Sequence, residues 1–85
     1  MNIDYKTMIV IRQFLLWVLK NKEDTNNFYS NVLNQFDVYY KTAESVSVFN
    51  KGITFCITYD LASDIASVVN KYFNAYNFMG DMLDD

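Results

Sequence analysis

The chain has 85 residues, of which 52% are apolar and 18% aromatic, and 10 acidic against 7 basic residues give a net charge of −3. This length suits a single domain, residues 1–85, and is too short for two ordinary hydrophobic cores. With no His, one Cys and two Gly, the composition excludes a His-based catalytic relay, a structural zinc site, an internal disulfide and a glycine-rich phosphate loop. We therefore expect no cofactor and no metal, and the mild acidity disfavours direct nucleic-acid binding.

Two segments bear on cellular location. Residues 1–6 lack the basic start and apolar continuation of a secretory signal. The most apolar stretch, residues 8–19, is shorter than the roughly 20 residues that span a bilayer. A protein without a membrane segment and with a single Cys is expected in the cytoplasm, which would be the host cytoplasm if a phage encodes it.

Residues 4–21 have the length and composition of a helix that is apolar almost all round. Its polar stripe contains only Lys6, Gln13 and Lys20, at heptad spacing. Such a helix is either surrounded by the rest of the domain or uses a second apolar face for a partner or for a homodimer. Arg12 lies among these apolar residues, so it requires a carboxylate from this chain or from a partner.

Residues 25–41 predict an amphipathic helix, with Asp24 or Thr25 as its N-cap. Val38 is the one apolar residue on the polar face. That face consists mostly of Asn and Gln amides, which indicate either a solvated surface shaped by AT-rich codons or a recognition surface. An alternative ends the helix near Asn34 and makes residues 36–40 a third strand, because Phe36, Val38 and Tyr40 alternate.

Residues 45–49 and 53–59 are rich in strand-forming residues, and Asn50-Lys51-Gly52 between them favours a turn. We therefore predict a β-hairpin. A two-residue loop and a three-residue loop with a bulge are both compatible with the turn, so the register stays open. Cys56 is expected to be a small packed side chain within the second strand.

Residues 61–79 predict the last amphipathic helix, with Asp60 as N-cap and Gly80 at its end. Residues 80–85 then form a short acidic C-terminal tail, and Phe78 is an apolar outlier on the polar face. The predicted fold is a small single α+β domain in the order α-α-β-β-α, with three amphipathic helices packed on one face of the hairpin.

An enzyme of this composition would depend on carboxylates, Lys, Tyr or Ser. Asp60 and Asp64 are the close carboxylate pair on a helix, and their place in its first turn favours capping and interaction with the helix dipole. We therefore expect no catalytic residues and a non-enzymatic protein.

The apolar residues in excess of a small core indicate binding to another protein. The predicted contact patch combines acidic and apolar residues of the C-terminal segment with Arg12, and its acidic groups would suit a basic surface on the partner. The members of this patch are Arg12, Phe78, Asp81, Met82, Leu83, Asp84 and Asp85.

In size and composition, though in no motif, the chain resembles small phage-encoded inhibitors of host defence such as anti-CRISPR proteins. It also resembles immunity proteins that neutralise a cognate toxin. The first resemblance implies a viral or mobile-element inhibitor that occludes a binding surface on a host protein. The second implies an immunity or antitoxin-type protein, and a homo-oligomeric accessory subunit is a further alternative.

Overall fold

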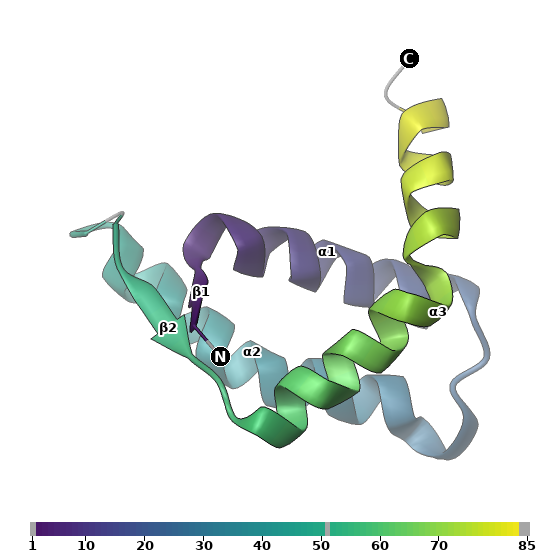
Figure 1. Cartoon of the computed structure of the whole chain (residues 1–85), viewed down its shortest axis with the longest axis horizontal. Coiled ribbons are helices and arrows are strands. Elements are labelled where there is room, and N and C mark those ends of the chain that lie inside the picture. Colours follow the sequence, from purple (N-terminus) through teal and green to yellow (C-terminus); the bar gives the residue numbers. More distant parts are fainter. Residues whose placement is uncertain (1, 51, 84–85) are drawn as a thin grey trace.

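The computed structural model describes residues 2–50 and 52–83, with the side chains of residues 77–83 outside that description. Figure 1 shows three helices and a small two-stranded sheet. In chain order the elements are β1 (Asn2–Asp4), α1 (Tyr5–Asn21), the short 3-10 turn η1 (Thr25–Asn27), α2 (Phe28–Ser47), β2 (Thr54–Cys56) and α3 (Tyr59–Leu83).

The three helices enclose one apolar core. α1 and α2 run side by side in opposite directions, and α3 crosses the pair and extends beyond it at its C-terminal end (Figure 1). Each helix contributes side chains that are almost completely buried, such as Phe14, Phe36 and Leu61. Burial of such residues is the main favourable contribution to folding in a domain of this size.

α1 begins where Asp4 accepts a hydrogen bond of 2.9 Å from the backbone N–H of Thr7, as predicted for a helix starting near residue 4. One face of the helix is buried against the core, yet Val10 is 48% exposed and Leu16 40% exposed. The rest of the domain therefore does not surround α1 completely. Part of its second apolar face reaches the surface, as one of the two interpretations of this segment requires.

α2 is continuous from Phe28 to Ser47, so residues 36–40 are helical and the alternative third strand is wrong. The Asp24 carboxylate accepts hydrogen bonds from the backbone N–H groups of Tyr29 at 2.7 Å and Ser30 at 3.1 Å, so its side chain caps the first turn of α2. The residue directly before the helix is Asn27 rather than Asp24 or Thr25. Val38 is 67% exposed, which confirms it as the apolar outlier on the polar face.

The predicted hairpin is wrong in its first strand. Residues 45–47 continue α2, because Ala43 and Ser47 extend the buried stripe that contains Phe36 and outweigh the strand preference of the valines. The second strand exists as β2, but it pairs antiparallel with β1, with Ile3 opposite Phe55. Cys56 ends this strand and is exposed rather than packed.

α3 starts two residues earlier and ends later than predicted. The Thr58 hydroxyl accepts a hydrogen bond of 3.2 Å from the N–H of Leu61, so Thr58 caps the helix and Asp60 lies in its first turn. The helix continues through Gly80 to Leu83, so the predicted end at Gly80 is wrong. Glycine costs about 1 kcal/mol in a helix interior but does not by itself end a helix.

The α+β class, with three helices packing on a two-stranded antiparallel sheet, is confirmed. Within the described ranges, 2–50 and 52–83, no helix has the length and apolar character needed to cross a membrane.

Candidate functional site

Arg12 finds its carboxylate within the chain. Its Nε donates to Asp37 Oδ1 at 2.9 Å, and its guanidinium lies 4.9 Å from the ring centre of Tyr40. The Arg12 and Asp37 side chains are 35% and 23% exposed, so this ion pair is partly desolvated. The structure thus selects the internal partner for Arg12, and its role in binding another protein stays a prediction.

The rest of the predicted contact patch cannot be placed against the core. The backbone of Phe78, Asp81, Met82 and Leu83 belongs to α3, but their side chains lie outside the described ones. Asp84 and Asp85 lie outside the described residues altogether. The patch therefore also stays a prediction.

The carboxylates considered for catalysis remain on one face of α3, where Asp60 is exposed and Asp64 half-buried. Over the part of the chain that the structure describes, no three His, Cys, Asp or Glu side chains gather closely enough to hold a metal ion.

An apolar groove separates α3 from α1 and β1, with a volume of about 250 Å³. Seven of its eight lining side chains are apolar, and Asn70 adds an amide at one border. The residues of this apolar groove are Ile3, Ile11, Ile57, Ala62, Ile65, Ala66, Val69 and Asn70.

Short side chains on α3 explain why the groove stays open. Ala62 and Ala66 lie one turn apart, and neither reaches far enough to fill the space towards α1. Ile11 sits on the face of α1 that also carries buried Val18, yet it is only half-buried because the groove exposes it. The groove is therefore a part of the core that the chain leaves uncovered.

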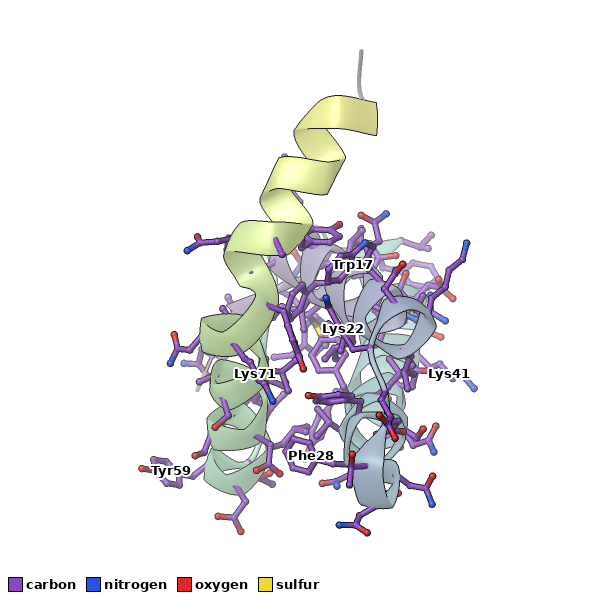
Figure 2. All side chains as sticks on the ribbon, turned by 90° about the vertical axis from the view of Figure 1, so that its right-hand side faces the viewer. Trp17, Lys22, Phe28, Lys41, Tyr59 and Lys71 are labelled. Atoms are coloured by element: carbon purple, nitrogen blue, oxygen red, sulfur yellow. The ribbon has the colours of Figure 1, made fainter. Side chains whose placement is uncertain are left out.

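A second hollow, which we call the aromatic–lysine cleft, lies on the opposite side of α3, facing the start of α2. It has a volume of about 180 Å³ and is lined by Phe28, Tyr29, Ser67, Val68 and Lys71. Figure 2 views this end of the molecule, with Lys71 on α3 and Phe28 at the start of α2.

Two tyrosines join α2 to α3 next to this cleft. The Tyr29 hydroxyl donates to the Tyr72 hydroxyl at 3.0 Å, and the two rings meet edge to face with centres 5.9 Å apart. The hydrogen bond from Tyr29, with the nearby Lys71, lowers the pKa of Tyr72. The interaction of Lys71 with the Tyr72 hydroxyl raises the pKa of Lys71 and so favours its ammonium form.

Lys22 approaches Tyr72 from the end of α1. Its Nζ lies 5.3 Å from the ring centre of Tyr72 and 5.6 Å from that of Trp17, while Lys71 Nζ is also 5.3 Å from the Tyr72 ring centre. Two ammonium groups thus lie near one aromatic ring. Within residues 2–50 and 52–76, neither has a carboxylate within 4.0 Å.

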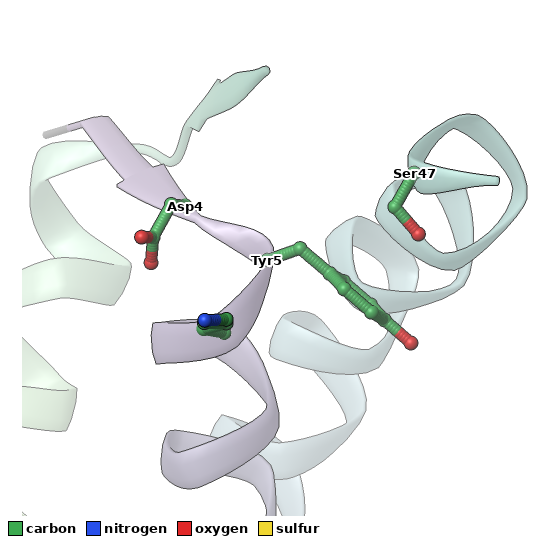
Figure 3. Close-up of a pocket in the computed structure, with 4 residues that line it drawn as sticks. Asp4, Tyr5 and Ser47 are labelled. Atoms are coloured by element: carbon green, nitrogen blue, oxygen red, sulfur yellow. The ribbon is translucent and has the colours of Figure 1, made fainter. Parts of the chain in front are cut away.

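A third hollow, of about 340 Å³, lies where β1 meets α1 and is lined by Asp4, Tyr5, Lys6 and Ser47 (Figure 3). Its polar groups serve the fold: Asp4 caps α1, and the Ser47 hydroxyl donates to the Glu44 carbonyl at 3.2 Å. The Tyr5 ring stacks on Tyr40 with centres 5.9 Å apart. Despite its size, this hollow offers little beyond its structural contacts.

No family model, curated protein or solved structure matches the chain.

Sequence reasoning missed both hollows that flank α3. Ala62 and Ala66 gave a signal for the groove, since two small residues one turn apart on an apolar face leave room for another side chain. The cleft had no local signal, because Tyr29 on α2 and Lys71 on α3 come together only through the packing of the helices.

Proposed function

We propose that the chain is a non-enzymatic protein-binding module that inhibits its partner by occluding one of the partner's binding surfaces. The observation that carries the proposal is the apolar groove between α1 and α3. Uncovered apolar surface that continues the core is typical of sites where another protein completes the packing.

The chemistry of the groove defines its occupant. Its lining of isoleucine, valine and alanine side chains suits an aliphatic or aromatic side chain from a partner protein, with Asn70 able to hydrogen-bond the partner's backbone. Burying one such side chain contributes about 1.5–3 kcal/mol. The occupant we propose is therefore an apolar anchor residue on the surface of a protein partner.

The biological setting belongs to the same proposal. A phage or mobile element would encode the chain, and it would act in the host cytoplasm against a defence protein, as anti-CRISPR proteins do. Small size, mild acidity and the uncovered groove support this proposal. An immunity protein would use the same groove against a cognate toxin, and the identity of the captured partner decides between the two.

Affinity capture from cells that carry the gene tests the groove. Ala66→Arg places a charge in the apolar groove, whereas Asn74→Arg places the same charge on an exposed position of α3 outside the groove lining. We expect the unchanged chain and Asn74→Arg to retain the same partner protein. Ala66→Arg should retain it at least about tenfold more weakly, because a charge in apolar surroundings is costly.

Circular dichroism of both variants controls for folding. Equal capture by a folded Ala66→Arg variant would overturn the role of the groove. The purified partner then tests inhibition: its activity should fall in proportion to the amount of complex formed, and unchanged activity at saturation would overturn the inhibitor function.

A further inference from the structure

We propose that the aromatic–lysine cleft is an anion-binding site for a carboxylate on an acidic, partly apolar peptide segment of a partner protein. Lys71, which lines the cleft, would contact the carboxylate together with Lys22, which reaches the neighbouring Tyr72 ring from the end of α1. Phe28 would contact the adjoining apolar side chain. The inference rests on the proposed function for the carrier of the anion, a protein, whereas the site itself rests on the geometry of the cleft.

The charge around the cleft is unbalanced. The Nζ atoms of Lys22 and Lys71 each lie 5.3 Å from the centre of the Tyr72 ring, so two positive charges gather around one aromatic side chain. Within residues 2–50 and 52–76, the one ion pair is Arg12–Asp37, which lies between α1 and α2. An anion bound beside Lys71 would be attracted by both positive charges.

The carboxylate that borders this region is already saturated. Asp24 Oδ1 accepts from the N–H of Tyr29, and Asp24 Oδ2 accepts from the N–H of Ser30 at 3.1 Å and from its hydroxyl at 2.5 Å. These hydrogen bonds, the one with the Ser30 hydroxyl above all, lower the pKa of Asp24. Asp24 is thus committed to capping α2 and leaves the lysines to an external anion.

The walls of the cleft select an amphipathic ligand. Phe28 is 40% exposed and meets Tyr29 edge to face with ring centres 5.7 Å apart, so it offers an aromatic surface at the border of the hollow. Val68 adds an aliphatic surface, and the Ser67 hydroxyl donates to the Ser63 carbonyl at 3.2 Å. An acidic residue next to an aromatic or aliphatic one fits these surroundings.

A carboxylate suits the cleft better than a phosphate. Two lysines act as point charges, without the Arg fork that binds phosphate in a bidentate manner. A polyphosphate backbone would also meet the overall charge of −3, which opposes the binding of nucleic acid. An acidic protein segment presents one or two carboxylates locally and avoids most of that repulsion.

Nuclear magnetic resonance of the full chain with a blocked peptide, Gly-Glu-Phe-Glu-Gly, tests the site directly. We expect saturable shifts of the side-chain signals of Lys22, Lys71 and Tyr72. A Lys22→Gln/Lys71→Gln double variant should bind about tenfold more weakly, since each surface ion contact contributes a fraction of that factor. Lys41→Gln is the matched control, because Lys41 is exposed on α2 outside the cleft lining (Figure 2), and it should bind like the unchanged chain.

Three results would overturn the proposal. They are the absence of saturable binding, equal binding of the matching peptide Gly-Gln-Phe-Gln-Gly, and equal binding by the double lysine variant. Displacement of the peptide by inorganic phosphate, beyond the effect of chloride at equal ionic strength, would assign the site to phosphate instead and contradict the carboxylate ligand.

The same titration separates this inference from the proposed function. Ala66→Arg changes the groove and leaves the cleft lining intact, so it should bind the peptide like the unchanged chain. If Ala66→Arg captures the partner as well as the unchanged chain does, and the peptide still binds in the cleft, only the proposed role of the groove is rejected. If the partner is captured through the groove but the peptide does not bind, only the proposed anion-binding role of the cleft is rejected.

Discussion

The α1–α2 pair and α3 differ in how they join the domain. α1 and α2 are tied by the Arg12–Asp37 ion pair and by the stacked rings of Tyr5 and Tyr40, in addition to their shared core. α3 joins them through buried side chains such as Leu61 and Val68 and through aromatic edges, such as Tyr76 against Phe14 with ring centres 5.4 Å apart. It is bordered by a hollow on each side. We therefore expect the helix pair to dominate the stability of the domain, and we propose that a partner binds at the borders of α3.

The largest expected effect is in the core of the helix pair. Phe36→Ala removes a fully buried ring from the middle of α2 and should lower the free energy of unfolding by about 3–5 kcal/mol. Phe73→Ala, at a half-buried position on α3, should cost less. Urea denaturation followed by circular dichroism measures both free energies of unfolding. A larger decrease in Phe73→Ala than in Phe36→Ala would show that α3, and not the helix pair, dominates the stability.

The cap of α2 gives the next largest effect and makes it depend on pH. Because hydrogen bonds lower the pKa of Asp24 below its ordinary value of 3.8, its stabilisation is complete above that value and disappears as pH falls through the lowered pKa. Asp24→Ala should therefore melt at a lower temperature at neutral pH, with the difference from the unchanged chain shrinking in acid. A difference that persists unchanged in acid would exclude the charged cap.

A smaller effect is expected for the ion pair that ties α1 to α2. In a double-mutant cycle of Arg12→Ala and Asp37→Ala, the coupling free energy should be about 0.5–1 kcal/mol, since both side chains are partly exposed. The coupling should weaken in high salt. Urea denaturation of the four proteins measures it, and a coupling near zero would show that the aromatic and apolar contacts alone hold the pair.

The smallest effect is expected on the outer surface of the pair. Val38→Lys and Leu16→Lys change exposed apolar residues, so each should alter the free energy of unfolding by at most about 0.5 kcal/mol. Light scattering tests the homodimer alternative at the same positions. We expect a monomer of 10.0 kDa before and after Leu16→Lys. A dimer that Leu16→Lys dissociates would show that α1 forms an interface between two copies of the chain.

Local patterns predicted the helices because helix periodicity is written in consecutive residues. The buried faces of α1 and α2 and the strand at Thr54–Cys56 follow from such patterns. The partner of that strand did not, because Asn2–Asp4 is too short for a pattern and pairs across most of the chain. The extension of α2 was visible in principle, since Ala43 and Ser47 continue the stripe of Phe36.

The site was less predictable than the fold. The sequence predicted that Arg12 needs a carboxylate, but it did not identify Asp37 as that carboxylate. For residues at the edge of a helix's apolar face, a helical projection cannot tell whether the side chain is buried or exposed, because this depends on where the neighbouring helix packs. For the same reason, the groove and the cleft arise only once α3 is laid across the other two helices.

Hydrogen–deuterium exchange of the chain with and without its captured partner tests the assignment of binding to the borders of α3 most directly. We predict slower exchange in residues 3–11 and 57–70, which contain the residues that line the apolar groove, and unchanged exchange in residues 30–38 on α2. Slower exchange confined to residues 30–38, with none along 57–70, would contradict that assignment and place the partner on the amide-rich face of α2.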